Sequence, residues 1–181
     1  MTTTGDRLDG AVGFEVLEDA GTPALGQPAV AVRTPTVATG PLGTITTDRD
    51  PVPKLYWWSL DAALRAHRPV LYVIDTARPG VGDGCGSAIG EARIVGGSFP
   101  GLTVIHAEPY VSGDDDAVVT SPDQGPTRIA PWAAAWGVAA PPWMFVIAAD
   151  GTVTAKFQGI FGTDELLSAL RRVAPYAPGG H

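Results

Sequence analysis

The sequence predicts an α/β fold in which helices cover both faces of a mixed sheet. Three apolar runs of strand length, Val70–Ile74, Leu102–Ala107 and Met144–Ile147, alternate with segments of helical pattern. Asp150-Gly151 then predicts a hairpin turn, after which Val153–Phe157 returns as a fourth strand. Strands that alternate with helices favour a layered domain, and the closing hairpin makes the sheet mixed.

The helices are predicted from their end signals and their apolar faces. Ser59 is a suitable N-cap for a helix that ends near His67. A second helix is expected over about Ser87–Val95, where two glycines end it, and a short third over Ile129–Trp136. Thr163 is expected to cap the last helix, whose apolar side chains recur at helical spacing.

Composition and charge restrict the class of protein. The 181 residues are 45% hydrophobic and 17% charged, which suits one ordinary domain plus an extension. The net charge of −7 repels nucleic acid, so we expect no nucleic-acid partner. No run approaches the roughly 20 apolar residues of a membrane span, and we expect no span and no signal peptide in this chain.

The chain divides into a leader, a regular region and a tail. Residues 1–54 are rich in Pro, Gly and Thr, and are predicted to form an extended segment or linker, with one strand at Ala11–Leu17. The regular region is 55–175, and 176–181 is a tail. Within the regular region, 111–130 is polar and predicts a surface loop.

The candidate for chemistry is Cys85, the chain's single cysteine. It lies in a glycine-rich loop between a predicted strand and a predicted helix, and a helix N-terminus stabilises a thiolate. A lone cysteine excludes an internal disulfide. Two interpretations remain open here: an activated monothiol, or an inert thiol in a degenerate loop.

Three stretches resemble the thioredoxin superfamily: Arg68–Ile74, Cys85–Ala88 and Trp136–Gly151. The resemblance implies a thioredoxin-like three-layer sandwich with a central mixed sheet over 55–175, preceded by the extended N-terminal segment. It also implies that Pro142 is the family's cis-proline. The substrate-binding residues would then be Ala140, Pro141, Pro142 and Trp143, with Cys85 as the catalytic residue.

A narrower resemblance is to bacterial exported thioredoxin-like domains. It is carried by Thr103–Tyr110 and by the leader around Phe14 and Pro28. It implies an extracytoplasmic location, with the leader strand as the last strand of a preceding domain. The second cysteine of such proteins is missing here, at Gly80 or at Ala88, so we expect dithiol activity to be weak or absent.

Three functions follow as hypotheses. The first is a monothiol thiol–disulfide oxidoreductase that uses Cys85 on a protein or peptide thiol or disulfide partner. The second is a thioredoxin-like interaction domain without catalysis. The third is an exported module that handles copper, for which Cys85 and His106 would form only part of a site. His106 is more simply interpreted as a hydrogen-bonded core residue, and we expect no cofactor and no metal site.

Overall fold

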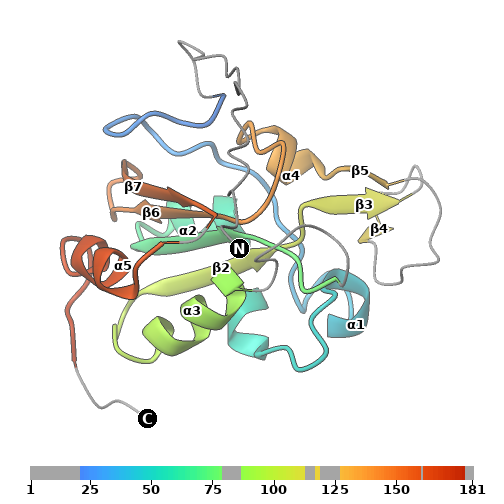
Figure 1. The fold of residues 1–181 in the computed structure, drawn as a ribbon, viewed down its shortest axis with the longest axis horizontal. Helices are drawn as coiled ribbons and strands as arrows, with labels where there is room; N and C mark the ends of the chain where they lie inside the picture. The colour runs from blue at the N-terminus through green and yellow to red at the C-terminus, as the bar shows by residue number, and fades with distance from the viewer. Residues whose placement is uncertain (1–20, 79–86, 113–116, 119–126, 160, 178–181) are drawn as a thin grey trace, which may run out of the picture.

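A four-stranded mixed sheet forms the centre of the molecule (Figure 1). The computed structural model describes residues 21–78, 87–112, 117–118, 127–159 and 161–177. The strand order is β2 (Thr103–Ala107), β1 (Val70–Ile74), β6 (Trp143–Ile147), β7 (Val153–Gln158). β1 and β2 are parallel, whereas β6 runs antiparallel to both β1 and β7. The predicted α/β class with a central mixed sheet is confirmed.

Helices lie on both faces of this sheet (Figure 1). Alternate residues of β1 point to opposite faces because the side-chain period of a strand is two. Leu71 and Val73 pack with α3 (Ser87–Gly96) and α5 (Thr163–Leu170). Tyr72 packs on the other face with α2 (Leu60–Arg65) and α4 (Pro131–Ala134). The domain is therefore a three-layer sandwich with two apolar cores.

The described part of the N-terminal segment packs along this sandwich. Pro28 forms an isolated bridge with Thr152, the residue before β7, and the Trp136 indole donates to the Val30 carbonyl at 2.9 Å. Farther on, α1 (Leu42–Ile45) and the 3-10 helix η1 (Pro53–Tyr56) contribute buried side chains to the core that contains α3. The predicted strand at 11–17 lies outside the described residues.

A second, small sheet replaces part of the predicted surface loop. Its strand order is β4 (Ala117–Val118), β3 (Tyr110–Ser112), β5 (Thr127–Ile129), with antiparallel pairing throughout. The loop prediction for 111–130 is wrong at these residues. Strands of two or three residues are too short for an alternating pattern to stand out against polar neighbours.

Two helix starts differ from the predictions. The N-cap of α5 is Gly162, and Thr163 is the first helical residue, whose hydroxyl donates to the Glu91 carboxylate at 3.2 Å. The third helix begins at Pro131 rather than at Ile129, because Ile129 pairs with β3 and proline is well suited to the first helical position. Of the helices that the structure describes, none is long and apolar enough to cross a membrane.

Candidate functional site

The carboxyl ends of β1 and β2 lie side by side, and each is followed by a buried carboxylic acid. Ile74 pairs with Ala107 at the end of the parallel ladder. The next residues, Asp75 and Glu108, are 0% and 2% exposed. Ligands of open α/β sheets bind at this kind of edge. We therefore take this edge as the candidate functional site.

Glu108 connects the N-terminal segment to this edge. Its Oε1 atom accepts hydrogen bonds from the Thr46 hydroxyl at 3.1 Å, the Thr47 amide at 2.7 Å and the Thr47 hydroxyl at 2.7 Å. Its backbone carbonyl accepts a bond from the Trp132 indole at 2.6 Å. Hydrogen bonds to a charged acceptor are stronger than neutral ones, so the carboxylate fixes residues 46 and 47 at the end of β2, and the backbone carbonyl of the same residue fixes α4 there.

Thr47 in turn fixes the chain where it leaves β1. The Ala77 amide donates to the Thr47 hydroxyl oxygen at 3.0 Å, and the hydroxyls of Thr47 and Thr76 lie 3.1 Å apart. The segment that follows, 79–86, contains Cys85 and lies outside the described residues. The described contacts thus fix Thr76 and Ala77, the residues that directly follow Asp75.

Asp75 caps the N-terminus of helix α3. Its carboxylate accepts hydrogen bonds from the Thr76 amide at 2.7 Å and from the Ile89 amide, in the first turn of α3, at 3.3 Å. Helix α3 has no acidic residue of its own in that turn. A carboxylate at a helix N-terminus satisfies a free backbone amide and is favoured by the helix dipole.

His106 is held in one tautomer by its two partners. Its Nε2 atom lies 2.9 Å from the Asp75 carbonyl oxygen, which can only accept, so Nε2 carries a hydrogen. In the neutral ring Nδ1 then accepts from the Tyr56 hydroxyl at 2.7 Å. Burial raises the pKa of Tyr56 well above its ordinary value, which keeps that hydroxyl protonated. His106 is thus a satisfied core residue.

The loop that contains Pro142 reaches the same edge of the sheet. Trp143, at the start of β6, pairs with Ile74, at the end of β1, so the loop lies beside Asp75. The peptide bond between Pro141 and Pro142 is cis. Ala140 is exposed, Pro142 is buried, and Trp143 is partly buried.

The hydrogen-bonding groups of this loop are limited. Pro141 has no backbone N–H, and the Pro142 carbonyl already accepts a bond from the Gly159 amide at 3.1 Å. Ala140 makes no hydrogen bond with any other part of the chain that the structure describes. The Trp143 ring stacks on Phe145, with centroids 5.5 Å apart and planes 2° apart, and so stays beside the sheet.

Sequence reasoning did not single out the buried polar residues of this edge. Asp75, Glu108, Tyr56 and Thr47 belong to the site by geometry. The signal for the two acids was available, because each directly follows a fully buried strand in a position where an acid is unusual. No local pattern marked Thr47, whose partners are distant in sequence.

Metal binding finds no support among the side chains that the structure places. Within the described ranges, no group of three or more His, Cys, Asp or Glu side chains is positioned to hold an ion. Both ring nitrogens of His106 are already engaged. Ligation by His106 would break one of these buried hydrogen bonds.

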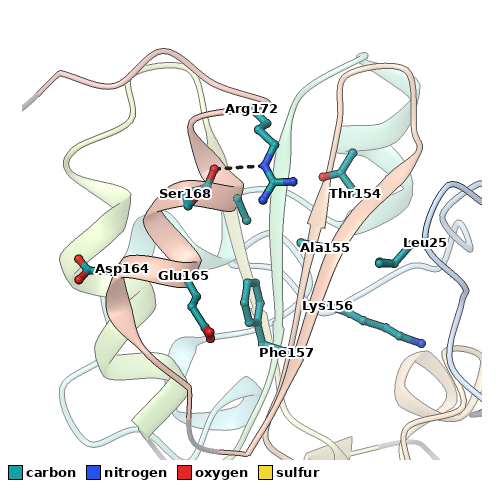
Figure 2. Close-up of a pocket in the computed structure, with 10 residues that line it drawn as sticks. Leu25, Thr154, Ala155, Lys156, Phe157, Asp164, Glu165, Ser168 and Arg172 are labelled. Carbon is teal, nitrogen blue, oxygen red and sulfur yellow. Dashed lines mark hydrogen bonds between the residues drawn. The ribbon is translucent and has the colours of Figure 1, made fainter.

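A pocket of about 650 Å³ lies elsewhere, between β7 and α5 (Figure 2). Its charged groups have both signs, since Lys156 and Arg172 line it together with Asp164 and Glu165. The Lys156 ammonium donates to the Thr22 hydroxyl at 2.9 Å, and Arg172 donates to the Ser168 carbonyl at 3.4 Å. These side chains already have partners, and the pocket has no uniform charge.

No family model matches the chain, and no curated protein matches it. Among solved structures, the chain is similar to a thio-disulfide isomerase from Thermus thermophilus, with 17% identity and a TM-score of 0.47. The matched part covers 83% of this chain and 97% of that one. The order and directions of β2, β1, β6 and β7, with helices on both faces, give this chain a thioredoxin-like fold.

Proposed function

We propose that this protein is a monothiol thiol–disulfide oxidoreductase in which Cys85 is the nucleophile and a protein or peptide disulfide is the substrate. The observation that carries the proposal is the meeting of three elements at one sheet edge. The Ile74–Trp143 pair brings the loop before β6 to the end of β1. The hydrogen bond from the Ile89 amide to the Asp75 carboxylate brings the first turn of α3 to the same place.

Chain connectivity supports the place of Cys85 in this arrangement. Cys85 is two residues before Ser87, where α3 begins. Two trans peptide units span at most about 7 Å between Cα atoms. The N-terminus of a ten-residue helix favours a nearby anion, and a thiolate is the reactive form of cysteine.

The proposed reaction needs one protein sulfur and an external thiol. The Cys85 thiolate attacks one sulfur of a substrate disulfide, forming a mixed disulfide and releasing the other substrate sulfur as a thiolate. A small thiol such as glutathione then attacks the mixed disulfide, which frees Cys85 and leaves the glutathione joined to the first substrate sulfur. With no second cysteine, the chain cannot close an internal disulfide.

The loop 140–143 is proposed to contact the substrate. The Pro141 carbonyl and the backbone of exposed Ala140 are the groups to which an extended peptide would bind. Because Pro141 lacks an N–H, only an acceptor is offered at that residue, and we expect weaker peptide pairing than a non-proline residue would give.

Turnover of a glutathionylated peptide tests the proposal. With glutathione as co-substrate, the wild-type protein should release the peptide thiol, and Cys85→Ser should reduce the rate by at least about 100-fold. His67→Ala, an exposed residue outside the site, is the matched control. Equal rates for the wild type and Cys85→Ser would overturn the assignment.

A second candidate is an interaction domain without redox turnover. The observation that favours it is the loop itself, where Pro141 offers no donor and the Pro142 carbonyl is already bonded. If this candidate is correct, the same assay gives no release above background with the wild-type protein, while the fold remains intact by circular dichroism.

A further inference from the structure

Two adjoining pockets lie beside edge strand β2, near the residues at which the strand begins. One, of about 210 Å³, lies between η1 and α3, and the other, of about 200 Å³, is lined by Trp57, Trp58 and Thr103. Both are lined by Lys54 and Val104, so they are neighbours. We call them together the η1 groove, defined by Val52, Lys54, Trp57, Arg68, Arg93 and Val104.

The η1 groove is basic on an acidic protein. The chain has 12 Lys and Arg against 19 Asp and Glu, yet Lys54, Arg68 and Arg93 line the groove and no carboxylate does. The charge of Arg93 is paired with Asp48. Lys54 and Arg68 have no carboxylate partner among the described residues. The uncompensated charge is therefore concentrated at the pocket that contains Trp57 and Trp58.

The guanidinium of Arg68 is held in place before any ligand arrives. Its Nε donates to the Thr103 hydroxyl at 2.5 Å, and its Cζ lies 4.9 Å from the centre of the Trp58 ring. A guanidinium fixed in this way loses little side-chain entropy when a carboxylate binds its remaining donors. Lys54 is exposed and supplies a second cation to the same pocket.

Large apolar side chains are exposed at the same place. Trp57 is 60% exposed and Val52 is 38% exposed, although the sheet residue beneath them, Val104, is 7% exposed. Tryptophan and arginine are the residues that contribute most often to binding hot spots. An apolar side chain seated in the groove would cover Trp57 and Val52, while a neighbouring carboxylate faced Lys54 and Arg68.

We propose that the η1 groove binds an acidic peptide segment of a partner protein, in which an apolar side chain is flanked by Asp or Glu. Charge complementarity selects this occupant. Three cations are too few for a nucleic acid, whose backbone would also be repelled by the net charge of −7. The groove lies beside the start of β2, whereas the candidate redox site follows its end, so docking is independent of Cys85.

A set of fluorescein-labelled octapeptides tests this proposal. Each carries one Leu, Phe or Trp flanked by Glu, and its control carries Gln at every Glu position. At about 150 mM salt, fluorescence anisotropy should show saturable binding of at least one acidic peptide, at least 10-fold tighter than its Gln control. A chain that binds none of the acidic peptides better than their Gln controls would overturn the proposal.

Charge reversal locates the binding site. Lys54→Glu should weaken the acidic peptide at least 10-fold, and Trp57→Ala should weaken both acidic and neutral peptides. Arg171→Glu, on an exposed residue after α5, changes the net charge by the same amount and should have little effect. Equal loss in Lys54→Glu and Arg171→Glu, or tighter binding of a single-stranded DNA oligonucleotide, would contradict the assignment. Circular dichroism confirms that each variant is folded.

Discussion

At the scale of single residues, the core contains a hydroxyl that its surroundings do not satisfy. Tyr72 is fully buried in an aromatic cluster, 5.1 Å from Trp136 and 6.4 Å from Phe145 by ring centroids. Within the described structure its hydroxyl has no hydrogen-bond partner. A buried polar group without a partner loses its hydration and gains nothing in exchange.

Removal of this hydroxyl should therefore not destabilise the protein. Tyr72→Phe keeps the ring contacts and removes the unpaired group, so the free energy of unfolding should stay the same or rise by up to about 2 kcal/mol. Urea denaturation measures the change. A loss of more than about 1 kcal/mol would mean that the hydroxyl has a favourable partner.

The same tyrosine should make the protein lose stability at alkaline pH. Burial raises the pKa of both Tyr72 and Tyr56 above the ordinary value near 10. When the pKa of a group is higher in the folded than in the unfolded protein, its contribution to the free energy of unfolding is complete below the unfolded pKa. This contribution is lost as the pH rises above that value, because the unfolded protein then releases the proton more readily. Between pH 9 and pH 11 the free energy of unfolding of the wild type should fall. In Tyr72→Phe the fall over the same range should be smaller, by up to about 1.4 kcal/mol. Parallel losses in urea denaturation would show that Tyr72 does not contribute.

Glu108 illustrates the opposite case, a buried acid with several partners. Glu108→Ala leaves the Thr46 and Thr47 donors without an acceptor and should lower the free energy of unfolding by about 2–4 kcal/mol. Glu108→Gln keeps an acceptor oxygen and should lose less. Hydrogen exchange at the Thr47 amide should accelerate in the Ala variant. Equal stability of the two variants would contradict the role of this carboxylate.

At the scale of elements, the N-terminal segment packs against the turn that follows α4. Gly137 has a φ of +66°, and a Cβ atom built there would lie 1.7 Å from the Gly21 carbonyl oxygen. The close approach therefore requires glycine at this position, both for the backbone conformation and for the space. This contact, with the bond from Trp136 to Val30, attaches the segment to the α2 and α4 face.

Substitution of Gly137 tests that attachment. Gly137→Ala should lower the free energy of unfolding by more than about 2 kcal/mol, or displace the chain around Gly21, because clash and strain act together. Gly151→Ala is the matched control, since it has a φ of +88° with open space and should cost about 1 kcal/mol. Hydrogen exchange of residues 21–36 reports the displacement. Equal effects at the two glycines would contradict the contact.

The sequence predicts the elements whose signals are local and extend over several residues. β1 was predicted with its observed bounds, and β2 and β6 within one residue, because each is a mostly buried apolar run long enough to stand out. β7 is largely half-buried, and it was predicted within one residue because the Asp150-Gly151 turn signal precedes it. β3, β4 and β5 were missed because they are only two or three residues long. The site residues Thr47 and Glu108 are 61 positions apart, and such a pair leaves no periodic signal.

At the scale of the whole molecule, two regions with different chemistry share one sheet. The redox proposal concerns the edge where β1 and β2 end, while the η1 groove lies beside the start of β2. A thioredoxin-like fold hosts many functions, so the activity has to be argued from the sites rather than from the fold. The redox proposal depends on activation of Cys85 by the N-terminus of α3.

The pH dependence of Cys85 alkylation tests that claim most directly. Because the chain has a single cysteine, the rate of reaction with iodoacetamide, followed by mass spectrometry, reports this thiol alone. Activation by the helix predicts an apparent pKa clearly below the ordinary value of about 8.5 in the folded protein, and a return to that value in urea. An apparent pKa at or above about 8.5 in the folded protein would contradict the redox assignment.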